Sequence, residues 1–152
     1  MTAISHDVPA AEPALTGLTV KDVMVTAPAT MRPTATVADA RAFFADDHVH
    51  MALIATSGRL LGTLVRADLD DDAAPALSRS RLDGRSVALG KPAEDVRLRL
   101  IAHGVRRLAV VDDAGALAGL LCLKRKLTGF CTDADVTARA AERAAAPTAR
   151  GR

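Results

Sequence analysis

Apolar and polar residues follow helix and strand spacings in turn along most of the chain. From Val37 to Phe44 the apolar positions fall on one face of a helix, which predicts a helix over 36–47. The segment Thr36-Val37-Ala38-Asp39 resembles a capping box, with Asp in place of the usual Glu or Gln, and marks the start of that helix. Apolar runs over 51–55 and 60–65, separated by Ser57-Gly58, predict a β-hairpin directly after it.

The same order of elements returns in the second part of the chain. A helix is predicted over 92–103 with Pro92 in its first turn, and a second hairpin over 107–123 turns at Asp113-Ala114-Gly115. In this alignment Val49 matches Val105 and Gly62 matches Gly119, so the second copy has one extra residue in its hairpin turn. Two copies of one unit indicate a pseudo-symmetric pair that buries a shared face. The cleft between such copies is a natural place for a small ligand.

Shorter segments complete the prediction. Thr19 starts a short helix, residues 29–32 are extended up to Pro33, and residues 85–89 form a strand. A further helix is expected to begin at Arg66 or Ala67 and to fade over 70–72. Another is expected to begin near Lys124 and to carry Leu127 and Phe130. An alanine-rich helix is expected from Asp133 to about Ala145. The predicted organisation is a mobile tail (1–17), a first unit (18–73), a linker (74–84), a second unit (85–131) and a C-terminal helix and tail (132–152).

Composition narrows the function classes. With no Trp, no Tyr and three Phe, the core must be aliphatic, and no stacking platform for nucleic acid is available. Twenty basic residues against eighteen acidic ones do not make the basic patch of a nucleic-acid binder.

No apolar run is long enough to cross a membrane and no signal peptide is visible, so a cytoplasmic protein with no membrane partner is predicted. The two cysteines, Cys122 and Cys131, match neither a disulfide framework nor a zinc site by number and spacing.

Three stretches of sequence carry a resemblance to a known family. They are Val20-Lys21-Asp22-Val23-Met24, then Ala35-Thr36-Val37-Ala38-Asp39-Ala40, and in the second copy the segment His103–Asp112. In this order, and over Leu18 to Cys131, the chain resembles a tandem pair of cystathionine-β-synthase (CBS) domains. The resemblance implies an α/β (α+β) fold, with two β-α-β-β-α units packed pseudo-symmetrically through their sheets and a C-terminal helix added. It also implies a non-catalytic module that commonly dimerises and binds adenine nucleotides in the clefts between units.

The family's ligand motif has Gly, two apolar residues, Ser or Thr, two variable residues, then Asp. In the first copy Gly62 and Asp68 match, but Val65 stands where the hydroxyl belongs; the resemblance assigns ribose binding to Asp68. In the second copy Gly119 matches, but Cys122 and Arg125 replace the hydroxyl and the acid. The ligand-binding residues predicted at the first site are Thr30, His50, Met51, Gly62, Arg66 and Asp68. A possible second site is predicted at Arg106, Arg107, Cys122, Lys124 and Arg125.

The chemistry of the residues around the first predicted site can also be considered without the resemblance. A helix start after Val65 would expose backbone N–H groups that suit an anion, and Arg66 could add a charge-assisted contact. Asp68 in that first turn is also favourable for the helix dipole with no ligand at all. His48 and His50, with Asp46 and Asp47 nearby, invite a metal site, but no further ligand follows at a convincing spacing, so no metal is predicted.

No Ser-His-Asp order, glycine-rich phosphate loop or metalloprotease helix is visible, so the chain is not predicted to be an enzyme. The predicted function is that of a regulatory module without a cofactor, which binds AMP, ADP, ATP or a related anionic metabolite at the first unit. We expect it to relay binding to a separate, unidentified protein and to form a homodimer. The alternative is a structural or dimerisation module that has lost its ligand, as Val65, Cys122 and Arg125 would suggest.

Overall fold

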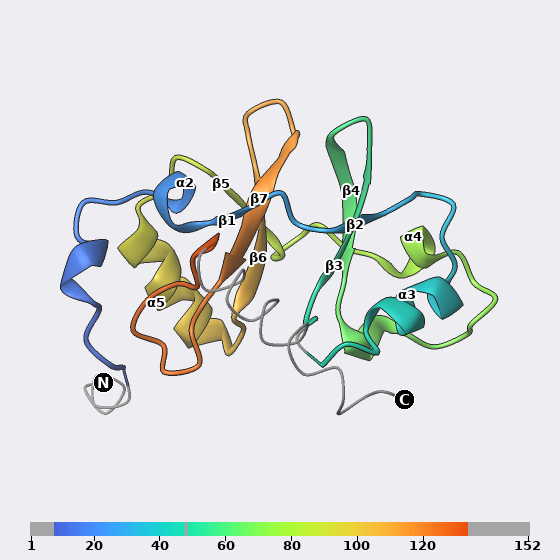
Figure 1. Cartoon of the computed structure of the whole chain (residues 1–152), viewed down its shortest axis with the longest axis horizontal. Coiled ribbons are helices and arrows are strands. Elements are labelled where there is room, and N and C mark those ends of the chain that lie inside the picture. Colours follow the sequence, from blue (N-terminus) through green and yellow to red (C-terminus); the bar gives the residue numbers. More distant parts are fainter. Residues whose placement is uncertain (1–7, 48, 134–152) are drawn as a thin grey trace, which may run out of the picture.

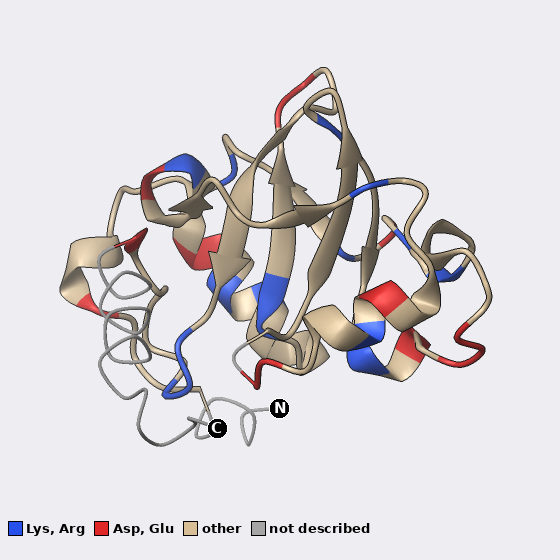
Figure 2. Ribbon diagram, turned by 45° about the vertical axis from the view of Figure 1, so that its right-hand side comes forward, with Lys and Arg blue, Asp and Glu red and all other residues tan. Residues whose placement is uncertain are grey.

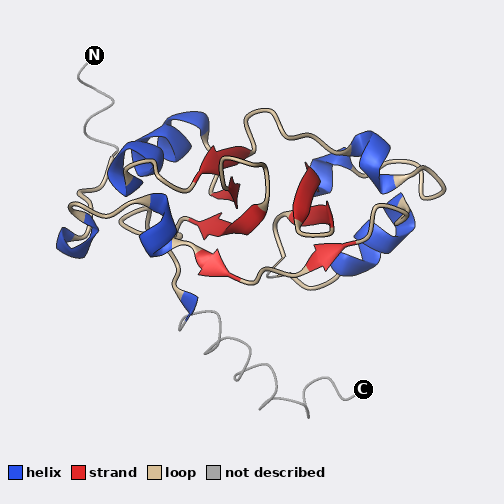
Figure 3. Cartoon of the chain, turned by 90° about the horizontal axis from the view of Figure 1, so that it is seen from above, coloured by secondary structure: helices blue, strands red, loops and turns tan. Residues whose placement is uncertain are grey.

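Two β-sheets lie side by side at the centre of the molecule, and helices cover their outer faces (Figures 1 and 3). The computed structural model describes residues 8–47 and 49–133. One sheet has the strand order β2-β3-β4 and the other the order β1-β7-β6-β5. Leu53 and Leu60 from the first sheet, with Met51 just before β3, pack with Ala109 from the second sheet, which makes the face between the sheets an apolar layer. Separate apolar clusters, each with a buried phenylalanine, lie between each sheet and its helices.

The first half is built from one helix and three strands. Its elements are β2 (Thr30–Met31), α3 (Val37–Phe43), β3 (Ala52–Thr56) and β4 (Arg59–Leu64). β2 runs parallel to β3, and β3 and β4 form the predicted hairpin. The capping box forms as expected, because the Asp39 N–H donates to Thr36 Oγ1 (3.2 Å) and the Thr36 N–H donates to Asp39 Oδ2 (2.9 Å). α3 ends at Phe43, four residues before the predicted end.

The second half repeats this plan. Its elements are β5 (Ser86–Ala88), α5 (Ala93–His103), β6 (Arg107–Val111) and β7 (Leu117–Cys122). β5 runs parallel to β6, and β6 and β7 form the second hairpin. Pro92 is the N-cap of α5, one position before the first turn predicted for it. Gly104 ends the helix in the left-handed conformation, with φ +69°, which favours glycine.

A short segment crosses from each half to the other. α2 (Val20–Val23) packs against α5, and β1 (Val25–Thr26) pairs antiparallel with β7. α2 and β1 precede the first half in the sequence but pack on the second. In return, α4 (Ala76–Arg79) packs against α3, and Arg81 pairs with Thr63 of β4 through two backbone hydrogen bonds of 2.9 Å. The exchange ties the two halves together through these short contacts. It also means that the segment 74–84, predicted as a linker, contains a helix and a sheet contact.

Two glycines at matching positions make this exchange possible. A Cβ on Gly119 would lie 2.6 Å from the carbonyl oxygen of Val25 in β1. A Cβ on Gly62 would lie 2.6 Å from the Cβ of Ser80, next to the paired Arg81. In each half the glycine therefore leaves room for the segment that arrives from the other half.

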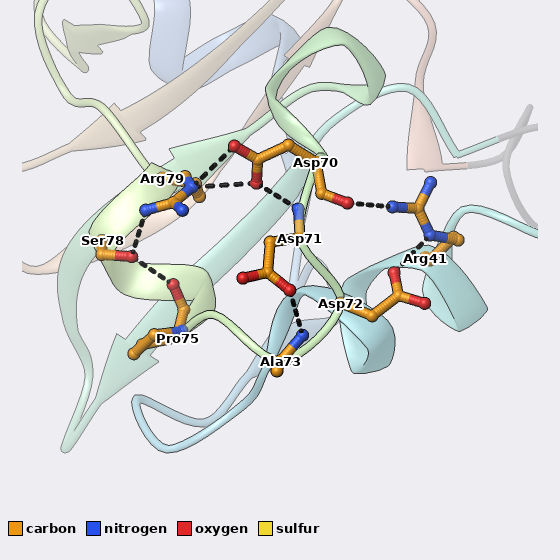
Figure 4. A network of polar contacts seen from close by, with 8 residues as sticks. All are labelled: Arg41, Asp70, Asp71, Asp72, Ala73, Pro75, Ser78 and Arg79. Carbon is orange, nitrogen blue, oxygen red and sulfur yellow. Dashed lines mark hydrogen bonds and ion pairs between the residues drawn. The ribbon is translucent and has the colours of Figure 1, made fainter.

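The helix predicted after β4 is only a short 3₁₀ turn, η2 (Arg66–Asp68). The acidic side chains that follow bind nearby backbone groups instead of continuing the helix (Figure 4). Asp70 Oδ1 accepts from the Asp71 N–H at 2.7 Å, and Asp71 Oδ1 accepts from the Ala73 N–H at 3.1 Å. Arg79 and Arg41 hold this segment from two helices through Asp70 and Asp72.

The prediction of a helix near Lys124 is also wrong. Residues 123–130 instead form a tight hairpin, in which Leu123 bridges Phe130 and the Lys124 N–H donates to the Gly129 carbonyl (2.9 Å). Leu127 adopts φ +67° at its tip. A cluster of cations at a helix start opposes the helix dipole, which disfavours the predicted element. The helix expected after residue 133 lies outside the described residues.

The mixed α/β class and the pseudo-symmetric packing of two units through their sheets are confirmed. Charged residues lie mainly on helices, connecting segments and strand ends, while the middles of the strands carry few (Figure 2). In the described part of the chain, no helix has the length and apolar character needed to cross a membrane.

Candidate functional site

A cleft of about 360 Å³ opens between the two halves, at the ends where β3 and β6 begin. It is lined by His50, Met51, Val65, Gly84, Arg85, Gly104, Val105, Arg106 and Arg107. The first half provides residues just before β3 and just after β4. The second half provides residues just before β5 and at the turn from α5 into β6. Both halves are therefore needed to form this cleft.

The cleft is cationic. Arg85, Arg106 and Arg107 line it together with His50, the arginines carry its positive charge, and none of the described residues that line it is acidic. Arg106 is half-buried, and its guanidinium makes no hydrogen bond or ion pair to any residue described in the structure. Guanidinium groups gathered around one hollow favour an anion with several oxygen atoms, because a guanidinium carries several N–H donors in one plane.

Asp68 and Arg85 form an ion pair beside the cleft. Arg85 Nη1 lies 2.6 Å from Asp68 Oδ2, and Arg85 Nη2 lies 3.2 Å from Asp68 Oδ1. The Asp68 side chain is 7% exposed and that of Arg85 is 18% exposed. The Val65 N–H donates to Asp68 Oδ2 as well, at 2.8 Å. The predicted ribose-binding carboxylate is therefore held by the protein itself and is absent from the lining of the cleft.

This environment changes the pKa of Asp68. Burial favours the neutral acid and would raise the pKa of Asp68. The hydrogen bonds from Arg85 and Val65 and the charges of Arg85 and Arg81 outweigh burial, so the pKa of Asp68 is lowered below its usual value. The carboxylate stays ionised at neutral pH and keeps the guanidinium of Arg85 in place.

Arg66, predicted as a ligand residue, points elsewhere. It donates to the carbonyl oxygens of Phe44 (2.7 Å), Val49 (3.0 Å) and Asp46 (3.3 Å). Its guanidinium also lies over the Phe44 ring, 5.2 Å from the centroid. Arg66 thus satisfies carbonyl groups after the end of α3, which explains why the chain turns there and α3 stops early.

Two further predicted residues lie apart from the cleft. Thr30 lines a second hollow of about 280 Å³, near the turn of the first hairpin, together with residues of β7. Gly62 is buried against Ser80. Of the first predicted site, only His50 and Met51 line the cationic cleft. The assignment of all six residues to one ligand remains a prediction, and the geometry does not bring them together.

The second predicted site is divided in the same way. Arg106 and Arg107 line the cleft beside His50 and Met51, so parts of the two predicted sites share one hollow. Cys122 is buried with its Sγ 2.9 Å from Cys131 Sγ. Lys124 Nζ donates to Glu12 Oε2 at 3.1 Å, and Arg125 is exposed.

Sequence reasoning missed Arg85. Its position as the first residue of the strand predicted over 85–89, at the same sheet end as Arg106, was the available signal. No motif marked it, because the family's ligand motif covers the residues that follow each hairpin and not the start of the second unit. Within the described ranges, no group of three or more His, Cys, Asp or Glu side chains is placed to hold a metal ion.

Comparison with known proteins identifies the fold. The CBS domain model matches residues 20–72 and 85–125, more than half of the chain. None of the curated protein sequences matches the chain significantly. The CBS domains of a transcriptional regulator from Streptococcus pneumoniae superpose with a TM-score of 0.63 at 18% identity, covering 73% of this chain and 97% of that one.

Two other similar structures were solved with nucleotides. The complex of CBSX2 with AMP gives a TM-score of 0.62 at 22% identity, covering 84% of this chain and 99% of that one. The CBS domain of a bacterial CNNM/CorC family Mg²⁺ transporter, in complex with ATP, gives 0.59 at 19% identity, covering 74% and 86%. The duplicated halves, their packing through the sheets and the two matched segments agree: this chain belongs to the CBS-domain family and carries two copies of the domain in tandem.

Proposed function

We propose that this chain is a regulatory module that binds an anionic small molecule, in the first instance an adenine nucleotide, in the cleft between its two halves. The observation that carries the proposal is the set of three arginines around one hollow, Arg85, Arg106 and Arg107, with no acidic residue among the described residues that line it. Cationic side chains that are partly withdrawn from water favour a nearby anion. A volume of about 360 Å³ falls within the range of small-molecule sites.

The arginines suit phosphate groups. Arg85 is oriented by Asp68, so a ligand would meet a guanidinium that is already fixed, and less side-chain freedom would be lost on binding. Arg106 has donors to offer without breaking a described contact. Phosphate oxygens accept paired N–H groups from such a fork.

The remainder of the cleft suits an apolar ring. Met51, Val65 and Val105 line it, and Val105 is 44% exposed, which is high for a large aliphatic side chain. A base stacked on these side chains would cover that exposed surface. AMP and ATP are the natural first ligands to test, because they are bound in the two similar structures described above.

A ligand in this cleft would touch both halves. It would favour the arrangement of the halves in which the two sets of cations fit one anion, and that differential affinity is what shifts an equilibrium between conformations. We propose that the output passes to a separate protein, and that the module forms a homodimer. Light scattering of the full chain, with and without nucleotide, tests the dimer.

Isothermal titration calorimetry tests whether the chain binds a nucleotide. The full chain is titrated with AMP, ADP, ATP and inorganic pyrophosphate. We expect binding by at least one nucleotide, and about tenfold or greater weakening in Arg106→Ala, because a charge-assisted contact contributes about 1.5–3 kcal/mol. Arg32→Ala is the matched control, since Arg32 is exposed and lines none of the described hollows. Pyrophosphate binding as tight as that of the nucleotides would assign recognition to the phosphates alone.

Absence of heat with all four compounds at millimolar concentration would reject the proposal. It would instead favour a structural module that binds no ligand. One observation supports that second candidate: Asp68, which the family motif assigns to a ribose, is held by Arg85 at 2.6 Å, so the protein supplies its own partner for this carboxylate.

A further inference from the structure

The two cysteines lie face to face. Cys122 ends β7 and Cys131 follows the hairpin of residues 123–130, and their Sγ atoms are 2.9 Å apart. The Cys131 N–H donates to the Cys122 carbonyl oxygen at 2.8 Å. Both are buried, with 6% and 7% of their surfaces exposed. The proposed ligand cleft does not use either thiol.

Their backbone geometry suits a covalent bond between them. Leu123 bridges Phe130 antiparallel, so Cys122 and Cys131 are the next opposed pair of the same ladder. Opposed residues in antiparallel strands have Cα atoms about 4.5–5.5 Å apart. A disulfide needs about 4.4–6.8 Å between its Cα atoms. The bond could therefore form with little movement of the backbone.

The hairpin between the cysteines joins several parts of the molecule. On one side the Leu123 N–H donates to the carbonyl oxygen of Arg106, which lines the cleft (2.8 Å). On the other side Lys124 and Thr128 bind the carboxylate of Glu12, in the N-terminal segment. Locking the base of this hairpin would affect both connections.

We propose that Cys122 and Cys131 form a reversible dithiol–disulfide pair. A peroxide oxidises one thiol to a sulfenic acid, and the peroxide O–O bond breaks with release of one water molecule or alcohol. The second thiol then attacks that sulfur, the S–S bond forms and a water molecule leaves with the thiol proton. Two electrons pass from the thiols to the peroxide. A small dithiol reverses the reaction by exchange, giving up two electrons and two protons and becoming a disulfide itself.

The first test needs no variant. The full chain is treated with hydrogen peroxide, alkylated under denaturing conditions and digested with trypsin without reduction. Cleavage after Arg107, Lys124, Lys126 and Arg139 gives peptides 108–124 and 127–139, which carry one cysteine each. We expect these peptides as one cross-linked species that dithiothreitol separates. Alkylation of both thiols after peroxide, a sulfinic acid without the cross-link, or a cross-link between two chains would overturn the proposal.

A second measurement follows the folded protein. Closing the loop from 122 to 131 restricts the unfolded chain, so we expect peroxide to raise the Tm by about 5 °C or more. Cys131→Ser is the control, because it keeps all four methionines, the other groups that peroxide oxidises. Peroxide should not raise the Tm of Cys131→Ser. An equal rise in the variant and in the unaltered chain would assign the effect to other residues.

Discussion

Arg85 holds the carboxylate of Asp68 at the junction of the two halves, with N–O distances of 2.6 and 3.2 Å. Asp68 follows β4 of the first sheet, and Arg85 precedes β5 of the second. Arg85 Nη1 also donates to the carbonyl of Thr63, at 3.3 Å. One guanidinium thus joins the end of the first hairpin to the start of the second half, at the wall of the cationic cleft.

This pair should couple the halves energetically. Removing one partner leaves a poorly solvated charge, so we expect Asp68→Asn to lower the free energy of unfolding by about 2 kcal/mol or more. Arg85→Gln should cost a similar amount, and the double variant less than the sum, with a coupling energy of about 1–3 kcal/mol. Urea unfolding of the four proteins measures this. Additive effects would mean that the two side chains contribute independently.

The same pair sets a pH dependence. The pKa of Asp68 is lower in the folded protein than in the unfolded chain, so the unfolded state binds more protons as the pH falls. The stabilisation is complete above the unfolded pKa of about 4 and is lost as the pH falls below it towards the folded pKa. We expect the unfolding free energies of the unaltered chain and of Asp68→Asn to converge below about pH 4. Urea titrations at pH 7 and pH 3 test this, and a constant difference would contradict it.

Gly62 and Gly119 should differ in whether a substitution there can be rescued. Gly62→Ala meets the side chain of Ser80, and Gly119→Ala meets the backbone carbonyl of Val25. Each change should cost about 1–3 kcal/mol through overpacking. Adding Ser80→Gly should recover much of the loss at Gly62, after allowance for the Ser80 hydroxyl bond to Leu77. The control is Gly119→Ala with Ser80→Gly, which should show no recovery. Equal behaviour in both backgrounds would mean that Ser80 is not the obstacle.

Much of the fold could be predicted because its signals are local. The hairpins follow from apolar runs around turn residues, and α3 follows from its spacing and its capping box at Thr36. The duplication then gave the pairing of the two units. The exchange of short segments could not be predicted in this way, because β1 is only Val25–Thr26 and its partner is more than ninety residues away.

The site was harder to predict for the same reason. His50, Met51, Arg106 and Arg107 stand at matching strand starts and were found from the repeat. Asp68 fits the family motif and Arg66 follows an expected helix start, yet both bind other partners in the fold: Arg85 binds Asp68, and Arg66 binds the carbonyls near the end of α3. A charged residue in a motif indicates where a contact is made, and the fold decides which partner makes it.

Arg97 gives a final prediction, on how the N-terminal segment is held. Its side chain is 2% exposed and binds both oxygens of Glu94, at 2.7 and 2.9 Å. It also donates to the carbonyls of Pro9 (2.9 Å) and Leu127 (2.8 Å). Lysine has no planar fork and cannot satisfy three partners in this geometry, so Arg97→Lys should destabilise the protein by about 2 kcal/mol or more.

Amide hydrogen exchange shows which part of the protein loses stability in Arg97→Lys. The Glu12 N–H donates to the Thr128 carbonyl at 2.9 Å, so its exchange reports docking of the N-terminal segment on the hairpin. We expect Arg97→Lys to speed exchange at Glu12 more than in the strands of the first sheet, because local opening costs less than global unfolding. Arg99→Lys is the control: it makes the same exchange of side chain in α5 at a position that binds neither Pro9 nor Leu127, so protection at Glu12 should be retained. Uniform loss of protection in Arg97→Lys would show that Arg97 stabilises the whole module and not this one contact.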